Sequence, residues 1–129
     1  MKIAIVGFAL SGFSFLKSVI DNKKNDKIEI DVYEKAREYP AGLPYEKDIL
    51  DKLLNVDTDE MVYPRENKDD FKDRMKDNNK KVNPIEKMAP RVYFASFLKD
   101  KAKDYINLPF VNIINEEVTD ISVSIIYRW

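Results

Sequence analysis

The first twelve residues constrain the fold of this chain more than any other segment. Residues 2–6 are Lys-Ile-Ala-Ile-Val, and glycines follow at positions 7 and 12. A short, continuously apolar run predicts a buried parallel strand. A glycine directly after such a strand permits a tight turn into a helix. We therefore expect a strand–turn–helix unit in which Gly7 forms the turn and Gly12 lets the helix pack closely on the strand.

A helix and a second strand follow in the order of a dinucleotide-binding βαβ unit. Apolar residues recur at helical spacing from Leu10 to Ile20, with Phe15 and Val19 widening the apolar stripe. Residues 28–33 alternate between apolar and polar, which predicts a strand less deeply buried than the first. Glu34 ends this strand, 22 residues after Gly12. An acid at that place accepts hydrogen bonds from an adenosine ribose and disfavours a 2′-phosphate.

Ala9 is the flaw in the glycine pattern. In G-x-G-x-x-G the middle glycine lets backbone N–H groups approach a pyrophosphate, which also binds the positive end of the helix. Ala9 occupies that middle position. Its methyl group adds bulk where the phosphate approaches, so we expect weaker binding. The alternative is a glycine turn that serves only the fold, because such turns occur in many α/β proteins.

The remaining segments predict further helices and strands separated by irregular chain. Residues 35–67 are broken by prolines around a short helix at 47–54, and residues 78–84 are expected to form a mobile loop. A charged helix over 69–78 carries Phe71 and Met75 on one face. The other expected elements are a helix over 91–106 and strands over 110–114 and 118–127.

Composition excludes several kinds of chemistry. The 129 residues include no cysteine and no histidine, so disulfides, thiolate nucleophiles, histidine acid–base catalysis and Cys/His zinc sites are excluded. No metal site is expected from the carboxylates. The net charge of −1 favours neither nucleic acid nor an anionic membrane as a partner. No segment has the apolar length of a membrane span, so we expect a cytoplasmic protein.

Several short motifs beyond the turn resemble one bacterial family. In order along the chain they are Val32-Tyr33-Glu34, Ala41-Gly42-Leu43-Pro44-Tyr45, Leu53-Leu54-Asn55, Met61, Asp69-Asp70-Phe71 and Pro90-Arg91-Val92-Tyr93-Phe94-Ala95-Ser96-Phe97-Leu98. Their order and spacing are similar to those of FAD/NAD(P)-binding proteins, a flavoprotein-like group related to amino-acid N-hydroxylating monooxygenases. The resemblance covers nearly the whole chain.

The resemblance implies an α/β, Rossmann-like βαβ FAD/NAD(P)-binding fold of three layers. It implies one domain over 1–129, with an irregular and helical insertion over 39–90. The glycine turn would bind the FAD pyrophosphate, Glu34 the adenosine ribose, and Leu54, Asn55 and Arg91 would lie nearer the flavin. For Asn55 a loop-capping role is the alternative, and for Arg91 a solvated helix start. The implied cofactor-binding residues are Gly7, Phe8, Ala9, Leu10, Ser11, Gly12, Glu34, Lys35, Asn55 and Arg91.

The chain departs from the family at Ala9 and in its length. Family members continue through another strand to an Ala-Thr-Gly turn, which does not occur before Trp129. We therefore expect a fold that is incomplete at the C-terminus, with an open strand near residues 125–129 that promotes homo-oligomers. The predicted function is the FAD/NAD(P)-binding domain of a flavin-dependent oxidoreductase, with no catalytic side chain of its own. FAD is the expected cofactor and NAD(P) the alternative. The other hypothesis is a non-catalytic remnant or interaction module that retains no cofactor.

Overall fold

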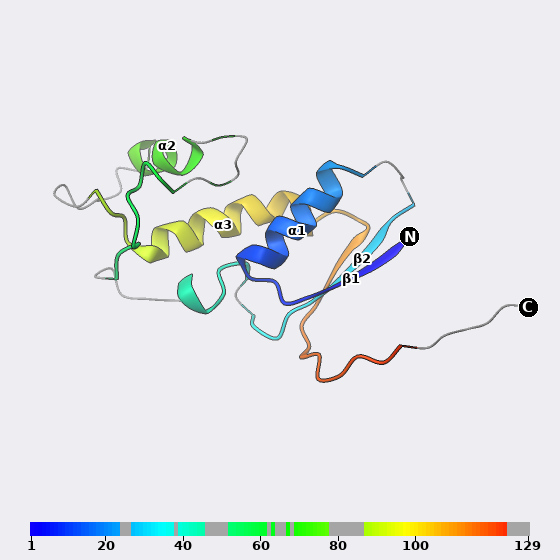
Figure 1. Ribbon diagram of the computed structural model, residues 1–129. Coiled ribbons are helices and arrows are strands. Elements are labelled where there is room, and N and C mark those ends of the chain that lie inside the picture. Colours follow the sequence, from blue (N-terminus) through cyan, green and yellow to red (C-terminus); the bar gives the residue numbers. More distant parts are fainter. Residues whose placement is uncertain are drawn as a thin grey trace, which may run out of the picture.

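The computed structural model describes residues 1–23, 27–37, 39–45, 52–61, 63, 67, 69–77 and 87–123. Three strands form its sheet: β1 (Lys2–Val6), β2 (Glu29–Tyr33) and β3 (Val111–Ile114). The helices are α1 (Leu10–Asp21), α2 (Asp70–Asp77) and α3 (Arg91–Ile106), with a short 3₁₀ turn η1 (Leu43–Tyr45). The helices lie on one side of the sheet, with α1 and α3 side by side above the strands (Figure 1).

The three strands are parallel and lie in the order β1-β2-β3. Ile3 pairs with Ile30, which pairs with Val111, so an apolar row crosses the sheet on the side of the helices. Each connection between neighbouring strands includes a helix, α1 between β1 and β2 and α3 between β2 and β3. The predicted α/β, Rossmann-like fold is confirmed. The expected three layers are not seen in the described residues, where the helices cover one face of the sheet (Figure 1), because both crossovers between parallel neighbours run on the same side.

The predicted burial of the first two strands is wrong in both cases. In β1 only Ile5 is fully buried, and Val6 is 55% exposed. In β2 Ile30, Asp31 and Val32 are all buried. The reason is position in the sheet: β2 lies between two strands, whereas β1 is an edge strand of the described sheet. An apolar run identifies a strand, but its neighbours decide how much of it is covered.

Two apolar clusters form the core. The first joins the sheet to α1 and to the C-terminal half of α3. The second joins the N-terminal half of α3 to α2 and to residues of the 39–90 insertion. Phe71 and Met75 of α2 are both buried in the second cluster, as their spacing predicts. Helix α3 therefore belongs to both clusters. The residues buried along it are Phe94, Ala95, Phe97, Leu98 and Ala102.

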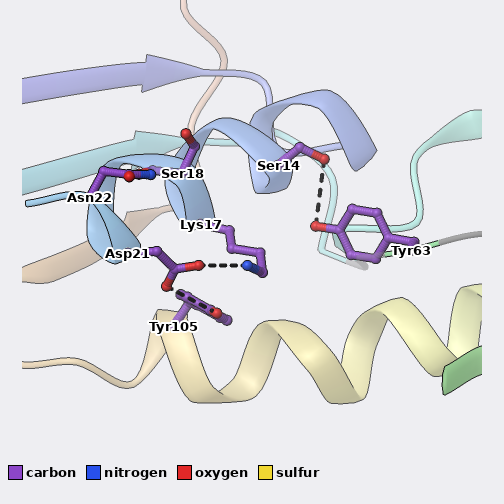
Figure 2. Close-up of polar contacts among 7 residues, drawn as sticks. All are labelled: Ser14, Lys17, Ser18, Asp21, Asn22, Tyr63 and Tyr105. Atoms are coloured by element: carbon purple, nitrogen blue, oxygen red, sulfur yellow. Dashed lines mark hydrogen bonds and ion pairs between the residues drawn. The ribbon is translucent and has the colours of Figure 1, made fainter. Parts of the chain in front are cut away.

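Polar contacts fasten α1 to its neighbours (Figure 2). Lys17 Nζ lies 2.5 Å from Asp21 Oδ2, and the Tyr105 hydroxyl of α3 donates to Asp21 Oδ1 at 3.3 Å. Burial and the negative charge of Asp21 raise the pKa of Tyr105. Nearer the start of α1, on the same face of the helix, Ser14 Oγ donates to the Tyr63 hydroxyl at 3.5 Å. These contacts hold this face of α1 against α3 and the insertion.

Most predicted elements are present, and the exceptions lie in the irregular segments. The helices expected over 10–20, 69–78 and 91–106 and the strand over 110–114 are confirmed. Phe15 is 53% exposed, so the apolar stripe of α1 is narrower than predicted. The strand expected over 118–127 is wrong for residues 118–123, and residues 124–127 lie outside the described residues. For the helix expected over 47–54, residues 52–54 are not helical and 47–51 lie outside the described residues. The loop expected over 78–84 also lies outside them.

None of the helices in the described ranges is both long enough and apolar enough to cross a membrane.

Candidate functional site

Gly7 and Gly12 are required at the end of β1 for two different reasons. Gly7 has a φ of +86°, a left-handed conformation that residues with side chains rarely adopt. Gly12 has an ordinary conformation but lies against the turn. A Cβ built on Gly12 would lie 3.1 Å from the carbonyl carbon of Gly7 and closer still to its oxygen. The first glycine therefore shapes the turn, and the second lets α1 approach it.

The N-terminus of α1 presents backbone donors that no side chain caps. Ala9 is the residue before the helix, has an extended conformation, and makes no side-chain cap. The first intrahelical bond of the turn runs from Phe13 N to Ala9 O at 2.9 Å. The preceding N–H groups therefore lack intrahelical partners, and they carry the positive end of the helix dipole. Ala9 and Ser11 are exposed at this end of the helix.

Glu34 lies at the same edge of the sheet and is fixed by backbone amides. Its Oε2 accepts a hydrogen bond from Phe8 N at 2.5 Å, and its Oε1 accepts one from Ala36 N at 2.8 Å. A carboxylate has about four acceptor positions. Two remain for other donors, and the group is held in one orientation beside the glycine turn. The Phe8 N–H group therefore points to Glu34 and does not join the free N–H groups at the N-terminus of α1.

Ala9 packs against a third glycine, Gly42, which lies outside the turn motif. Gly42 has a φ of +66°, and a Cβ built on it would lie 2.7 Å from the Ala9 Cβ. Tyr39 belongs to the same segment and packs on Phe8 with ring centroids 5.5 Å apart. The start of the insertion therefore crosses the glycine turn directly at Ala9. From the sequence, Gly42 could be assigned only to a family motif, because no local pattern connects positions 9 and 42.

The other predicted turn residues take structural roles through their side chains. The Phe8 ring is fully buried and contacts the rings of Phe13 and Tyr39, so only its backbone faces the site. Leu10 is half-buried against the second cluster. Lys35 points away from the turn, with its Nζ 2.8 Å from Glu117 Oε1. That carboxylate raises the pKa of Lys35.

The residues expected nearer the flavin lie at the start of α3 and in the strand-like segment beside it. Arg91 is half-buried, and its Nε donates to the Leu53 carbonyl oxygen at 2.9 Å. Leu54 is buried in the second cluster, and Asn55 is exposed. Within the described residues, no hydrogen bond or ion pair joins Asn55 or Arg91 to the glycine turn. The structure therefore brings together the turn and Glu34, while Leu54 is connected to the turn through the second apolar cluster, against which Leu10 packs.

Two tyrosines of the insertion pack on aromatic rings of the protein itself. Tyr45 contacts Phe94 with ring centroids 5.2 Å apart, and Tyr63 contacts Phe13 at 5.8 Å. Tyr63 packs against both apolar clusters.

Comparison with protein families gives a match to this arrangement. A family model described as FAD-NAD(P)-binding matches residues 4–124, which include the turn, Glu34, the insertion and all three strands except the start of β1. The chain belongs to this family. Searches of curated proteins and of solved structures each gave no significant match. Membership establishes an FAD/NAD(P)-binding domain.

The residues of the turn fit the dinucleotide that the family binds. The left-handed Gly7, the close approach at Gly12 and the uncapped helix end are the features a pyrophosphate site requires. Ala9 is the one feature that adds a side-chain atom to the approach, and Gly42 lies against it.

Proposed function

We propose that this chain binds the ADP part of FAD at the glycine turn and serves as the nucleotide-binding domain of a flavin-dependent oxidoreductase. The fixed Glu34 carboxylate carries the proposal, because it is oriented before any ligand arrives. The ribose hydroxyls would donate to the acceptor positions that Phe8 and Ala36 leave open. NAD(P) is the alternative cofactor, and the negative charge of Glu34 disfavours the form with a 2′-phosphate.

The proposed binding residues fall into two groups. The backbone N–H groups at the start of α1 would hold the pyrophosphate. The residues proposed for this part of the site are those of the turn, namely Gly7, Phe8, Ala9, Leu10, Ser11 and Gly12. Glu34 would hold the ribose, with Lys35 beside it. Asn55 and Arg91 are proposed to face the flavin end of the ligand. For Arg91 the proposal rests on the family motif, because its Nε already donates to the Leu53 carbonyl oxygen at the start of α3.

FAD, when bound, supplies the electron-transfer chemistry of such enzymes. The chain's own residues bind and orient it: Gly7 and Gly12 bring the backbone close, and Glu34 selects the adenosine ribose. We propose no catalytic side chain. Residues 1–129 are proposed to act as one domain with an insertion over 39–90, because α3 contributes to both apolar clusters. The relation to N-hydroxylating monooxygenases is proposed on the motifs alone.

A second candidate function rests on the contact between Ala9 and Gly42. The insertion touches the turn at the position where a pyrophosphate approaches the backbone. This contact favours a module that keeps the fold without a cofactor.

Ligand-dependent stabilisation separates the two candidates. A ligand that binds only the folded state at 100 times its Kd adds about 2.7 kcal/mol of stability. We expect FAD and ADP to raise the melting temperature of the full chain, NAD to do so less, and NADP least. Glu34→Gln should reduce the shift in melting temperature caused by ADP, whereas Glu29→Gln, at the exposed start of the preceding strand β2, should not. A colourless protein that none of these ligands stabilises would support the module.

We also propose that copies of the chain associate through the edge of β1. Gly7 N donates to Tyr33 O and Met1 O accepts from Glu29 N, so alternation directs the peptide groups of Lys2, Ala4 and Val6 to the opposite edge. Ile121 and Val123 are 73% and 86% exposed and carry a strand-like pattern that could pair there in a second copy. Light scattering should detect dimers or larger species at tens of micromolar. A strict monomer at that concentration would contradict this proposal.

A further inference from the structure

The turn that carries Glu34 is held by hydrogen bonds from Asn115, which lies 81 positions later in the chain. Asn115 follows β3 directly, and its Nδ2 lies 2.8 Å from Glu34 O, 3.2 Å from Lys35 O and 3.3 Å from Ala36 O. One side-chain amide thus serves three consecutive carbonyl groups, which its two N–H groups share. We call residues 34–36 the acidic turn.

Among the described residues, the acidic turn has few other attachments. Glu34 N donates to Ile114 O at 3.0 Å, the last rung of the β2–β3 ladder. Beyond it, the Lys35–Glu117 ion pair is exposed on both sides, at 68% and 60% of the side chains. Exposed pairs of this kind contribute little to stability. Asn115 is therefore the principal restraint on the backbone between Glu34 and Ala36.

This backbone restraint determines where the carboxylate lies. Ala36 N donates to Glu34 Oε1, so the carboxylate is fixed only while the Ala36 peptide keeps its orientation. Asn115 donates to the Lys35 carbonyl oxygen, which belongs to the same peptide group as Ala36 N, and to the carbonyl oxygens of the two flanking peptides. Loss of the Asn115 amide would free the turn and, with it, the Oε2 contact to Phe8 N.

We propose that Asn115 is a positioning residue for nucleotide binding, which acts through Glu34 by holding the acidic turn in the orientation that presents the carboxylate to the ribose. This rests on the proposed function. It also assigns a role to the chain just after β3, which lies inside the matched family region. Asn115 itself is exposed, so its replacement leaves the apolar core intact.

The first test measures ADP affinity in the full chain. Asn115→Ala should weaken ADP binding about 2- to 10-fold, as expected for the loss of one positioning hydrogen-bond group. Asn115→Asp, which keeps the shape and loses both N–H donors, should weaken it at least as much. The matched control is Asn112→Ala on β3, three residues earlier, whose side chain donates to Asp31 and makes no hydrogen bond to the acidic turn within the described residues. It should bind ADP within twofold of the wild type.

Two further readouts separate positioning from a general structural effect. With 2′,3′-dideoxyadenosine diphosphate, which lacks the ribose hydroxyls, Asn115→Ala should change the affinity little, and in a Glu34→Gln background it should add no further loss. Equal losses for both ligands would overturn the proposal.

Amide hydrogen exchange tests the same restraint without any ligand. In Asn115→Ala the amides of Phe8 and Ala36 should exchange several-fold faster, while those of Ile5 and Val32 stay unchanged. Unchanged exchange at Phe8 and Ala36 would overturn the proposed restraint. If the wild type binds no adenine nucleotide, the proposed function fails, and the exchange result still decides whether Asn115 holds Glu34.

Discussion

Gly12→Ala is the most direct test of the close approach between the start of α1 and the turn at Gly7. The substitution adds one methyl group to the first turn of α1. That carbon would lie 3.1 Å from the Gly7 carbonyl carbon and closer still to its oxygen, and both of these are backbone atoms. No side chain can rotate away to make room. The start of α1 must therefore move from the turn by roughly 1 Å to restore an ordinary contact.

The packing of α1 gives the free-energy cost of that movement. Phe13 and Leu16 of α1 are fully buried, so a displaced helix disturbs the first apolar cluster. Overpacking of a core typically costs about 1–3 kcal/mol, and a backbone clash belongs at the upper end. Alanine is a better helix former than glycine by up to about 1 kcal/mol, which offsets part of the loss. We expect a net destabilisation of about 2–3 kcal/mol out of a total of about 5–15 kcal/mol.

Gly7→Ala is the matched control, because Gly7 is strained but has open space around it. A Cβ there would meet nothing within 4 Å, so only the φ of +86° opposes the change. A left-handed conformation costs about 1–2 kcal/mol, and a less flexible unfolded chain returns about 0.4–1 kcal/mol. The net loss should be about 1 kcal/mol.

Urea denaturation followed by circular dichroism at 222 nm measures both losses. With a slope of about 1–3 kcal/mol per molar urea, Gly12→Ala should lower the midpoint by about 1–2 M. Gly7→Ala should lower it by about half as much or less. A Gly12→Ala midpoint equal to or above that of Gly7→Ala would refute the close approach of α1 to the turn.

Three other predictions concern the helix end, the sheet and α2. Ala9→Asp should cap α1 and raise the free energy of unfolding by about 1 kcal/mol. It should also weaken ADP binding at least tenfold, because the carboxylate would occupy the free N–H groups. Thermal unfolding measures the first effect and ADP titration the second, and tighter binding would contradict the proposed phosphate site. The pKa of Asp31 is lowered by hydrogen bonds from Asn112 and Lys2, so its contribution is present above the ordinary aspartate pKa and is lost as pH falls through the lowered value. Asn112→Ala should therefore move the midpoint of acid unfolding to higher pH, and an unchanged midpoint would count against this contribution. Arg74 of α2 forms an ion pair with Asp100 of α3. Arg74→Ala should therefore speed amide hydrogen exchange in α2 while lowering the global free energy of unfolding by less than about 1 kcal/mol. Exchange in α2 at the wild-type rate would show that the pair does not hold the helix.

The sequence predicts those elements whose information is local. Helix α3 can be identified from its apolar spacing, and β3 from a short β-branched run. Gly7, Gly12 and Glu34 could be placed at one edge because the order strand, helix, strand fixes where parallel strands end. Each of these inferences needs only residues within one βαβ unit.

Features that depend on distant neighbours could not be predicted. The apolar run of β1 gives no sign that one of its faces is exposed, because that depends on which strands and helices lie beside it. The contact of Ala9 with Gly42 joins two segments that no periodicity relates. Asn115 is one polar residue in an irregular segment, and only the fold brings its amide to the acidic turn.

The contact between positions 9 and 42 limits the order in which substitutions can accumulate there. The two Cβ atoms would lie 2.7 Å apart, so the backbone has room for a methyl group at one position but not at both. With alanine at 9, a change from glycine at 42 meets both this clash and the left-handed φ of +66°. Glycine at 9 would remove the clash and leave the second obstacle in place. The two sites are therefore coupled, and alanine at 9 fits this backbone only when position 42 is glycine.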